Sequence, residues 1–143
     1  MFKKILRYGI LAIVALFVLI QLVPYGRAHT NPPVVQEPAW DSPATRALAQ
    51  RACFDCHSNE TAWPWYTNVA PVSWLTQQHV DEGRQTLNFS EWGNSRAREL
   101  DEIAEVILEG AMPMPNYLIM HPEARLSASE KQALIDGLNK SLR

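Results

Sequence analysis

Cys53-Phe54-Asp55-Cys56-His57 carries the strongest signal in this chain of 143 residues. Two thiols three positions apart, followed directly by a histidine, form the C-x-x-C-H pattern at which c-type haem is attached. Thiols one helical turn apart reach the two vinyl groups on one edge of the porphyrin, and the adjacent imidazole then lies under the iron. The pattern therefore predicts one covalently attached haem c, held through thioethers by Cys53 and Cys56, with His57 as the proximal iron ligand.

Three other uses of this cysteine pair fit the sequence less well. A thioredoxin-like redox pair requires a βαβ context, and strand signals are almost absent from the chain. A disulfide across two intervening residues is strained and closes too short a loop to stabilise the fold much. A zinc site would need a second Cys-x-x-Cys pair or equivalent ligands, and the chain has only two cysteines.

A methionine-proline loop is the best candidate for the second axial ligand of the iron. Gly110-Ala111-Met112-Pro113-Met114-Pro115 holds two methionines, and the neighbouring prolines fix the backbone that orients them. Small c-type cytochromes usually present a thioether sulfur from such a loop, so Met112 is the predicted distal ligand. Ligation by His57 and Met112 would raise the reduction potential relative to two histidines.

Other side chains remain open as distal ligands, namely Met114, His121 and His79, followed by Met120 and His29. His79 shares an apolar stripe with Val72 and Leu75, where a histidine is usually a hydrogen-bonded core residue. His121 directly precedes a proline, which suits a helix entry or a hydrogen bond. His29 lies in a polar stretch and is expected to be solvated.

Aromatic side chains are numerous for so small a domain, and they suit either core packing or a wall around the haem. They are Trp63, Trp65, Tyr66, Trp74, Phe89, Trp92 and Tyr117. Arg84 is a candidate partner for a haem propionate, because a guanidinium binds carboxylates with two parallel hydrogen bonds. A solvated surface arginine is the alternative at that position.

The N-terminus is the most apolar part of the chain. The apolar segment begins with three cations, Lys3, Lys4 and Arg7. A helix from Ile5 to Val23 would be about 28 Å long, close to the roughly 30 Å thickness of the hydrocarbon core of a bilayer. Residues 1–27 are therefore predicted to be a membrane anchor, with a cleaved signal peptide as the alternative. Both readings export the rest of the chain, which implies a single-pass protein of the bacterial cytoplasmic membrane with a periplasmic C-terminal domain.

Charge is distributed unevenly along the chain. It has 13 cations and 15 acids, a formal net charge of −2. Residues 1–27 contain four of the cations and no acid, so the remainder carries nine cations against fifteen acids, a formal −6. This balance excludes a basic nucleic-acid binder and suits electrostatic docking with redox partner proteins at the membrane. The hydrophobic content of 47% excludes a long disordered chain.

The remaining patterns predict an all-α fold. Residues 28–41 contain three prolines and no apolar period, so they are expected to form an extended tether. Residues 42–143 would then be the c-type haem-binding domain, a small cytochrome c-like domain of about four short helices around the haem. The expected helices are Ala44–Ala52 after the N-cap Ser42, Pro71–Leu87, one from Asn94 or Ser95 to Gly110, and one opened by the capping box Ser127–Glu130 with Leu134, Leu138 and Leu142 on its apolar face.

Together these motifs form a pattern that spreads over Leu48–Leu138. Its members are Cys53–His57, Ser58-Asn59-Glu60-Thr61, Trp63-Pro64-Trp65-Tyr66, Ala70-Pro71-Val72-Ser73-Trp74, His79-Val80, Gly83-Arg84, Leu87-Asn88-Phe89-Ser90, Trp92, Gly110, Met112-Pro113, Tyr117, His121-Pro122 and Leu126-Ser127. In this pattern the chain resembles the haem-binding-domain family of bacterial c-type cytochromes. The resemblance implies one covalent haem, usually on an exported or membrane-tethered domain, and its Met-Pro position corresponds to Met112 rather than Met114.

Three functions are compatible with a single haem of this type. A membrane-tethered monohaem cytochrome would pass single electrons between partners on the outer face of the cytoplasmic membrane, and this function leads. A peroxidase-like enzyme would need an open iron position and a distal acid or base, for which His79 or His121 could serve. A haem-based redox or gas sensor would use displacement of a weak methionine ligand as its signal. The sequence contains no catalytic dyad and no signalling domain.

Overall fold

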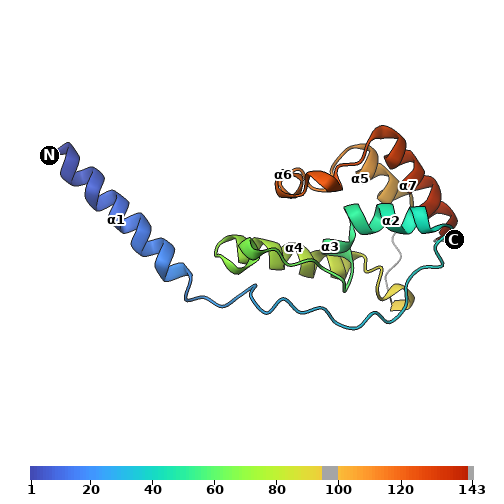
Figure 1. Ribbon diagram of the computed structural model, residues 1–143, viewed down its shortest axis with the longest axis horizontal. Coiled ribbons are helices and arrows are strands. Elements are labelled where there is room, and N and C mark those ends of the chain that lie inside the picture. The colour runs from blue at the N-terminus through green and yellow to red at the C-terminus, as the bar shows by residue number, and fades with distance from the viewer. Residues whose placement is uncertain (95–99, 142–143) are drawn as a thin grey trace. The chain divides into compact units, whose positions relative to one another are not determined.

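The structure is a computed structural model that describes residues 1–94 and 100–141 (Figure 1). Its α-helices within these ranges are α1 Phe2–Ile20, α2 Pro43–Ala52, α3 Phe54–His57, α4 Val72–Thr86, α5 Leu100–Leu108, α6 Tyr117–Met120 and α7 Ala128–Ser141. Short 3-10 helices cover η1 Trp65–Asn68, η2 Trp92–Asn94 and η3 Pro122–Ala124. The described residues contain no sheet, only one isolated parallel bridge between Gln36 and Glu91. The predicted all-α class is therefore confirmed; of the seven α-helices in the described ranges, six lie within residues 42–141, where about four were expected.

The chain divides into two compact units. The first unit consists of Met1–Thr30 and Trp63–His79, and the second consists of Asn31–Ala62 and Val80–Arg143. Helix α4 contributes residues to both units, because the division falls between His79 and Val80.

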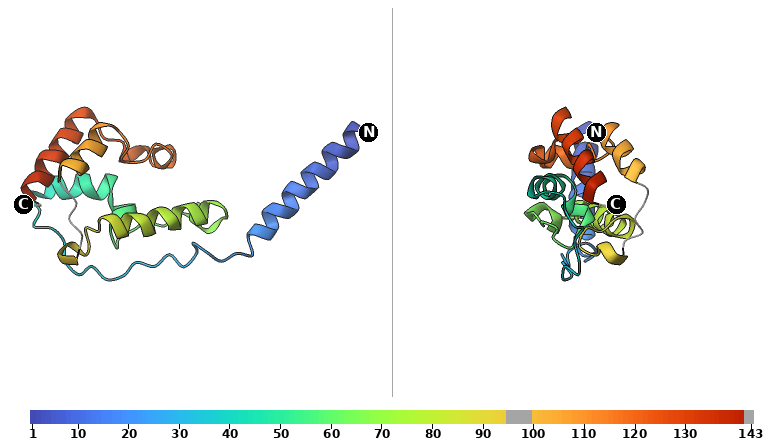
Figure 2. Two further views of the ribbon diagram at one scale, coloured as in Figure 1. Left: turned by 180° about the vertical axis from the view of Figure 1, so that it is seen from behind. Right: turned by 90° about the vertical axis from the view of Figure 1, so that its right-hand side faces the viewer.

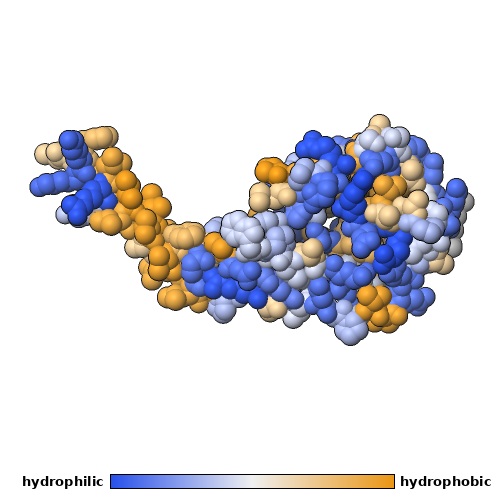
Figure 3. Space-filling view, viewed as in Figure 1, coloured by the Kyte–Doolittle hydropathy of each residue, from blue (hydrophilic) through white to orange (hydrophobic). Residues whose placement is uncertain are grey.

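Within the first unit, the segment that follows α1 binds the start of α4. The side chain of Gln21 forms a pair of hydrogen bonds with the backbone of Ala70, accepting at 3.0 Å from its N–H and donating at 2.9 Å to its carbonyl oxygen. Arg27 donates to the same Gln21 oxygen at 3.0 Å. Apolar side chains cover α1 itself and are exposed along its length (Figure 3).

The predicted membrane span at residues 5–23 is not found. Helix α1 ends at Ile20, and among the described residues no helix is long and apolar enough to cross a membrane. The first two turns of α1 carry Lys3, Lys4 and Arg7, which leaves uncharged helix only from Tyr8 to Ile20. That stretch is about 20 Å long at 1.5 Å per residue, whereas the hydrocarbon core is roughly 30 Å thick.

Helices α2, α5 and α7 form the helical core of the second unit. α7 packs against both α2 and α5 in the two views of Figure 2. The buried side chains between them include Ala49, Ile107, Leu134 and Leu138, which confirms the apolar face predicted for the last helix. The third residue predicted for that face, Leu142, lies outside the described residues.

Helix ends follow the local signals in the sequence. The Ser42 hydroxyl caps α2 by accepting from the Thr45 N–H at 3.2 Å. At α7 the Ser127 hydroxyl accepts from the Glu130 N–H at 3.3 Å, and the Glu130 carboxylate accepts from the Ser127 N–H at 2.8 Å. Both bonds of the predicted capping box are thus present. The predicted start of the third helix at Asn94 or Ser95 falls partly outside the described residues, and its predicted end is confirmed by Gly110 with φ of 75°.

Most of the predicted tether, residues 31–41, is extended but bound to the second unit. The N–H groups of Val35 and Gln36 donate to the Ser90 carbonyl at 2.8 and 3.1 Å, and Trp92 N–H donates to the Gln36 carbonyl at 2.9 Å. Trp40 packs against the hydrophobic core. Residues 31–41 are therefore part of the second unit, where they are hydrogen-bonded to the backbone of Ser90 and Trp92.

Candidate functional site

An apolar cavity lies in the second unit and contains three of the four predicted site residues. Its volume is about 830 Å³ including the open mouth. Cys53, His57 and Met112 line it, so the motif and the methionine loop, which are far apart in sequence, meet at one site. The other lining residues come mainly from α2, α5, α7 and the end of α4, and they are Ala52, Thr86, Leu87, Phe89, Glu102, Ile103, Val106, Ile107 and Leu138.

The cysteine motif occupies the junction of two helices. The N–H of Cys53 bonds to the Ala49 carbonyl at the end of α2, and the His57 N–H bonds back to the Cys53 carbonyl at 2.9 Å. Helix α3 is therefore a single turn, separated from the end of α2 by Cys53 alone. Phe54, which packs in the hydrophobic core, anchors this turn because only 2% of its surface is exposed.

Both thiols are held in their neutral form. Burial raises the pKa of Cys53 to about 12, and burial together with the Asp55 carboxylate raises the pKa of Cys56 to about 11. Both cysteines are free of disulfide bonding, and Cys56 is not among the residues that line the cavity. The pair is consequently unlike a reactive redox pair, whose attacking thiol has a lowered pKa.

His57 is oriented by two backbone carbonyls of the α4 end. Its Nδ1 lies 3.0 Å from the Gly83 oxygen and 3.1 Å from the Leu87 oxygen. Carbonyl oxygens only accept hydrogen bonds, so Nδ1 carries the proton and Nε2 carries the lone pair. Burial also lowers the pKa of His57, which keeps the imidazole neutral. A neutral imidazole fixed through its other nitrogen is the form in which histidine binds iron.

Gly83 allows α4 to approach the motif closely. A Cβ atom at this position would lie 2.3 Å from the Cys56 carbonyl oxygen and 2.8 Å from its carbonyl carbon. Both neighbours are backbone atoms, which cannot rotate out of the way. The glycine is therefore required for the contact through which its own carbonyl reaches His57.

Met112 is fixed near the end of α5. Gly110 adopts a left-handed conformation that ends the helix, and the Met112 N–H then donates to the Val106 carbonyl at 3.0 Å. The resulting turn folds the loop back over the last turn of α5, whose side chains also line the cavity. The loop thus brings Met112 to the cavity that His57 lines.

The alternative ligands lie elsewhere. Met114 and His121 are not among the lining residues, and Met120 is 55% exposed. His121 packs on the Tyr117 ring with its Nδ1 3.1 Å from the Glu123 carboxylate, which agrees with the hydrogen-bonding role expected for it. His79 is also not among the residues that line the cavity.

His29 lies in the first unit, and the prediction that it is solvated is wrong. Its Nε2 lies 3.1 Å from the Thr67 carbonyl oxygen, and its ring stacks on Trp63 with centroids 4.6 Å apart. The tether sequence gives no signal of this contact, because the partners lie more than thirty residues away along the chain.

Arg84 holds the segment that follows the motif. Its guanidinium donates to the Ser58 carbonyl at 2.8 Å and to the side-chain oxygens of Asn31 and Thr61, each at 3.0 Å. These contacts hold residues 31, 58 and 61 together, and the role of Arg84 toward a propionate stays a prediction. Burial lowers the pKa of Arg84, against the effect of nearby acids.

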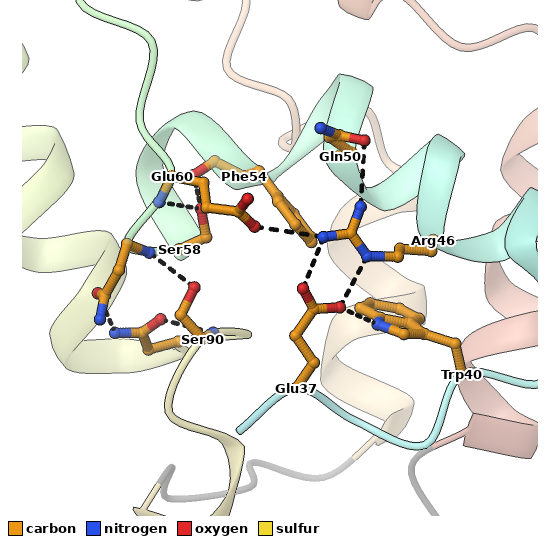
Figure 4. Close-up of polar contacts among 10 residues, drawn as sticks. Glu37, Trp40, Arg46, Gln50, Phe54, Ser58, Glu60 and Ser90 are labelled. Atoms are coloured by element: carbon orange, nitrogen blue, oxygen red, sulfur yellow. Dashed lines mark hydrogen bonds and ion pairs between the residues drawn. The ribbon is translucent and has the colours of Figure 1, made fainter. Parts of the chain in front are cut away.

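A buried polar network fixes the same segment from the other side (Figure 4). Asn59 N–H donates to the Ser90 hydroxyl at 2.9 Å, and the Asn88 amide donates to the Asn59 oxygen at 2.9 Å. All three residues are buried. Because buried polar groups are costly to leave unpaired, this network defines one position for the chain beyond His57.

Gly83, Leu87 and Tyr117 belong to the sequence pattern, but the sequence predicted no role for them in orienting the motif. Gly83 and Leu87 act through backbone oxygens, for which side-chain patterns give no signal. Tyr117 donates from its hydroxyl to the Asp55 carboxylate at 2.6 Å, and burial raises the pKa of that phenol. Asp55 could have been noticed as the one charged residue inside the motif, but nothing local identifies its partner.

The site fits a haem by the chemistry of its donors. It combines an apolar cavity, a neutral imidazole with a free Nε2 lone pair, a thioether and neutral thiols. Within the described residues, no group of three or more His, Cys, Asp or Glu side chains could hold a metal ion directly.

Comparison with known proteins gives a family match. The family model for the haem-binding domain matches residues 15–140, which covers the motif, the cavity and most of the chain. No curated protein and no solved structure matches the chain.

Proposed function

The chain belongs to the haem-binding domain family, and from that premise we propose that it is a c-type cytochrome that carries single electrons. The observation that supports this function is the meeting of Cys53, His57 and Met112 at one apolar cavity. When bound there, a haem would supply one-electron chemistry at iron.

Covalent attachment is proposed from the motif itself. Cys53 and Cys56 would form thioethers with the vinyl groups, and His57 would bind iron through Nε2. The neutral thiols suit a pair that awaits modification, since a thiol with a raised pKa resists oxidation to a disulfide or a sulfenic acid. The two backbone bonds to Nδ1 would keep the His57 ring in one orientation.

Electron transfer is favoured over catalysis by the way the cavity is lined. Met112 lines the same cavity as His57, so the two residues that would bind the iron both face the space in which a haem would lie. An enzyme would need an open position and a nearby acid or base. His121, one of the two histidines considered for that task, is hydrogen-bonded to Glu123 and does not line the cavity, and a peroxidase-like enzyme or a gas sensor remains only the alternative.

The proposed location of the protein is the outer face of the bacterial cytoplasmic membrane. Exposed apolar side chains along α1, together with Lys3, Lys4 and Arg7, suit attachment to an anionic lipid surface. The formal charge of −6 on residues 28–143 suits docking with basic patches of redox partner proteins.

The optical spectrum of the purified holoprotein tests this function. Ferric iron bound by a methionine sulfur gives a weak charge-transfer band in the red, which we expect in the wild type. Met112→Ala should lose the band and lower the reduction potential, whereas Met114→Ala, the matched control, should keep both. Haem should survive a denaturing gel in all three proteins but not in the Cys53→Ala/Cys56→Ala variant.

A high-spin, five-coordinate ferric spectrum in the wild type would overturn the carrier function and favour an enzyme or a sensor. Loss of the red band in Met114→Ala but not in Met112→Ala would overturn the ligand assignment alone. Haem that is extracted from the wild type by acid and organic solvent would show that it is not covalently attached.

A further inference from the structure

A hydrogen bond links the methionine loop to the cysteine motif. The Tyr117 hydroxyl on α6 donates to Oδ2 of Asp55 on α3 at 2.6 Å. Oδ1 of the same carboxylate accepts from the Ala62 N–H at 2.9 Å. Both Asp55 oxygens are therefore engaged, and the acceptor of Tyr117 is fixed in place. A hydrogen bond to a charged acceptor at this distance belongs to the stronger class.

The Tyr117 ring is held on a second side by stacking. The His121 ring lies parallel to it, with centroids 4.1 Å apart and planes 10° apart. His121 N–H also donates to the Tyr117 carbonyl at 3.1 Å, which closes the single turn of α6. The aromatic ring and the turn thus form one small unit, and the hydroxyl attaches that unit to Asp55.

Tyr117 lies between the two anchors of the loop. On the N-terminal side, the Met112 N–H is bound to the Val106 carbonyl of α5. On the C-terminal side, Ala124 is fully buried in η3, which packs against α2. The chain between these anchors is long enough to sample many conformations, and a tie near its middle removes most of them.

We propose that the Tyr117–Asp55 hydrogen bond is a latch that holds the methionine loop closed over the cavity, and that Tyr117 is a positioning residue for Met112. The inference rests on the proposed function, because it assigns Met112 as the distal ligand. A thioether is a weak ligand, so its occupancy depends on its effective concentration at the iron, which the latch raises by restricting the loop. Asp55 is thus a residue of the cysteine motif that would also hold the methionine loop in place.

Competition by an external ligand measures how strongly the latch retains Met112 on the iron. Ferric holoprotein is titrated with imidazole, and loss of the red charge-transfer band reports displacement of the methionine. Tyr117→Phe keeps the ring that stacks on His121 and removes only the hydroxyl, so we expect imidazole to bind about tenfold more tightly, the size of effect of one hydrogen bond to a charged group. Tyr66→Phe, which removes a hydroxyl from a partly buried tyrosine of the other unit, should bind imidazole as the wild type does.

Two further measurements separate positioning from general stability. Hydrogen exchange of the amides in residues 112–121 should accelerate in Tyr117→Phe, while the amides of α2 and α7 remain protected. Asp55→Ala should tighten imidazole binding to a similar degree, and adding Tyr117→Phe to it should cause little further change, because both substitutions remove the same bond.

The outcomes distinguish the latch from the function on which it rests. A wild type without the red band would overturn the assignment of Met112 and the positioning role with it. A wild type with the band, in which Tyr117→Phe leaves both imidazole affinity and loop exchange unchanged, would overturn the latch and leave the electron-carrier function intact. Additive effects of the two substitutions would also overturn it.

Discussion

At the scale of single residues, backbone oxygens orient the imidazole on the His57 side of the site. His57 Nδ1 donates to the carbonyls of Gly83 and Leu87, not to a carboxylate. A neutral carbonyl withdraws the proton less than a carboxylate does, so the imidazole keeps less anionic character, and as a ligand of a bound haem it would favour reduced iron. The geometry of this side therefore depends on the position of α4, and that position depends on a glycine.

Gly83→Ala tests this dependence. A Cβ atom would come within 2.3 Å of the Cys56 carbonyl oxygen, so α4 and α3 must separate. We expect a loss of about 1–3 kcal/mol in the free energy of unfolding, as for other overpacked cores, measured by urea denaturation. The reduction potential should also shift, because the Gly83 carbonyl moves away from His57.

Gly93→Ala is the matched control for this change. The nearest atom to a Cβ there is the side-chain oxygen of Gln36 at 3.1 Å, which can rotate away, and Gly93 is exposed. Its free energy of unfolding should change by a few tenths of a kcal/mol at most, as for ordinary surface sites. Equal effects of the two substitutions would contradict the steric argument.

At the scale of elements, local signals predicted what local interactions determine. The caps of α2 and α7 and the left-handed Gly110 lie where their residues indicate, since each depends on atoms within four residues. Helices α3 and α6 were missed because one-turn helices have no apolar period and depend on what they pack against. The bonding of residues 31–41 was missed for the same reason, as their partners lie far along the chain.

The same division applies to the site. The motif and the proline-flanked methionine are local patterns, so Cys53, Cys56, His57 and Met112 could be nominated from sequence. That three of them share one cavity required the fold. Gly83, Leu87 and Tyr117 contribute carbonyl oxygens or a hydroxyl from 26 to 62 residues away, and no spacing rule encodes such contacts.

The bond between the extended segment and α2 gives a pH-dependent prediction at this scale. Arg46 grips Glu37 with two hydrogen bonds of 2.6 and 2.7 Å, and the Trp40 indole donates to the same carboxylate at 2.6 Å (Figure 4). The bonds to Arg46 are the main reason that the pKa of Glu37 is lowered. A lowered pKa in the folded state means that this carboxylate adds stability above its unfolded pKa, and that the contribution is lost as pH falls through the folded pKa.

Glu37→Gln should therefore cost about 1 kcal/mol of unfolding free energy at pH 7, the upper range for partly exposed ion pairs, and progressively less below about pH 4.5. Urea denaturation of both proteins across this range measures the difference. Glu60→Gln, which removes a single 3.3 Å contact to Arg46, should have a smaller effect at every pH. A Glu37→Gln cost that stays constant down to pH 3 would show that charge is not its cause.

At the scale of the whole molecule, charge and apolar surface are segregated along the chain. Residues 1–27 hold four cations and no acids, and the remainder has a formal charge of −6. Large apolar side chains are exposed along α1, among them Val14 at 53% and Phe17 at 47%. Exposed apolar surface of this extent, next to a cluster of cations, is typical of a lipid-binding segment, whereas the acidic remainder would be repelled by anionic lipid.

Flotation of the full chain with vesicles tests whether α1 is the lipid-binding segment. The wild type should float with vesicles that contain anionic lipid. Once the apolar side chains of α1 have inserted into the bilayer, the complex should persist when salt is added. Val14→Lys/Phe17→Lys should abolish flotation, because two charges then interrupt the apolar surface of α1. Ile119→Lys places the same charge on a residue that is 77% exposed in α6, and it should float as the wild type does. If both variants float equally, α1 is not the lipid-binding segment.

The three cations of α1 are tested by Lys3→Gln/Lys4→Gln/Arg7→Gln. If the cations act through the surface potential, each is expected to contribute about 1 kcal/mol, so flotation with anionic vesicles should weaken by a factor near five per cation removed. Flotation with neutral vesicles should not change.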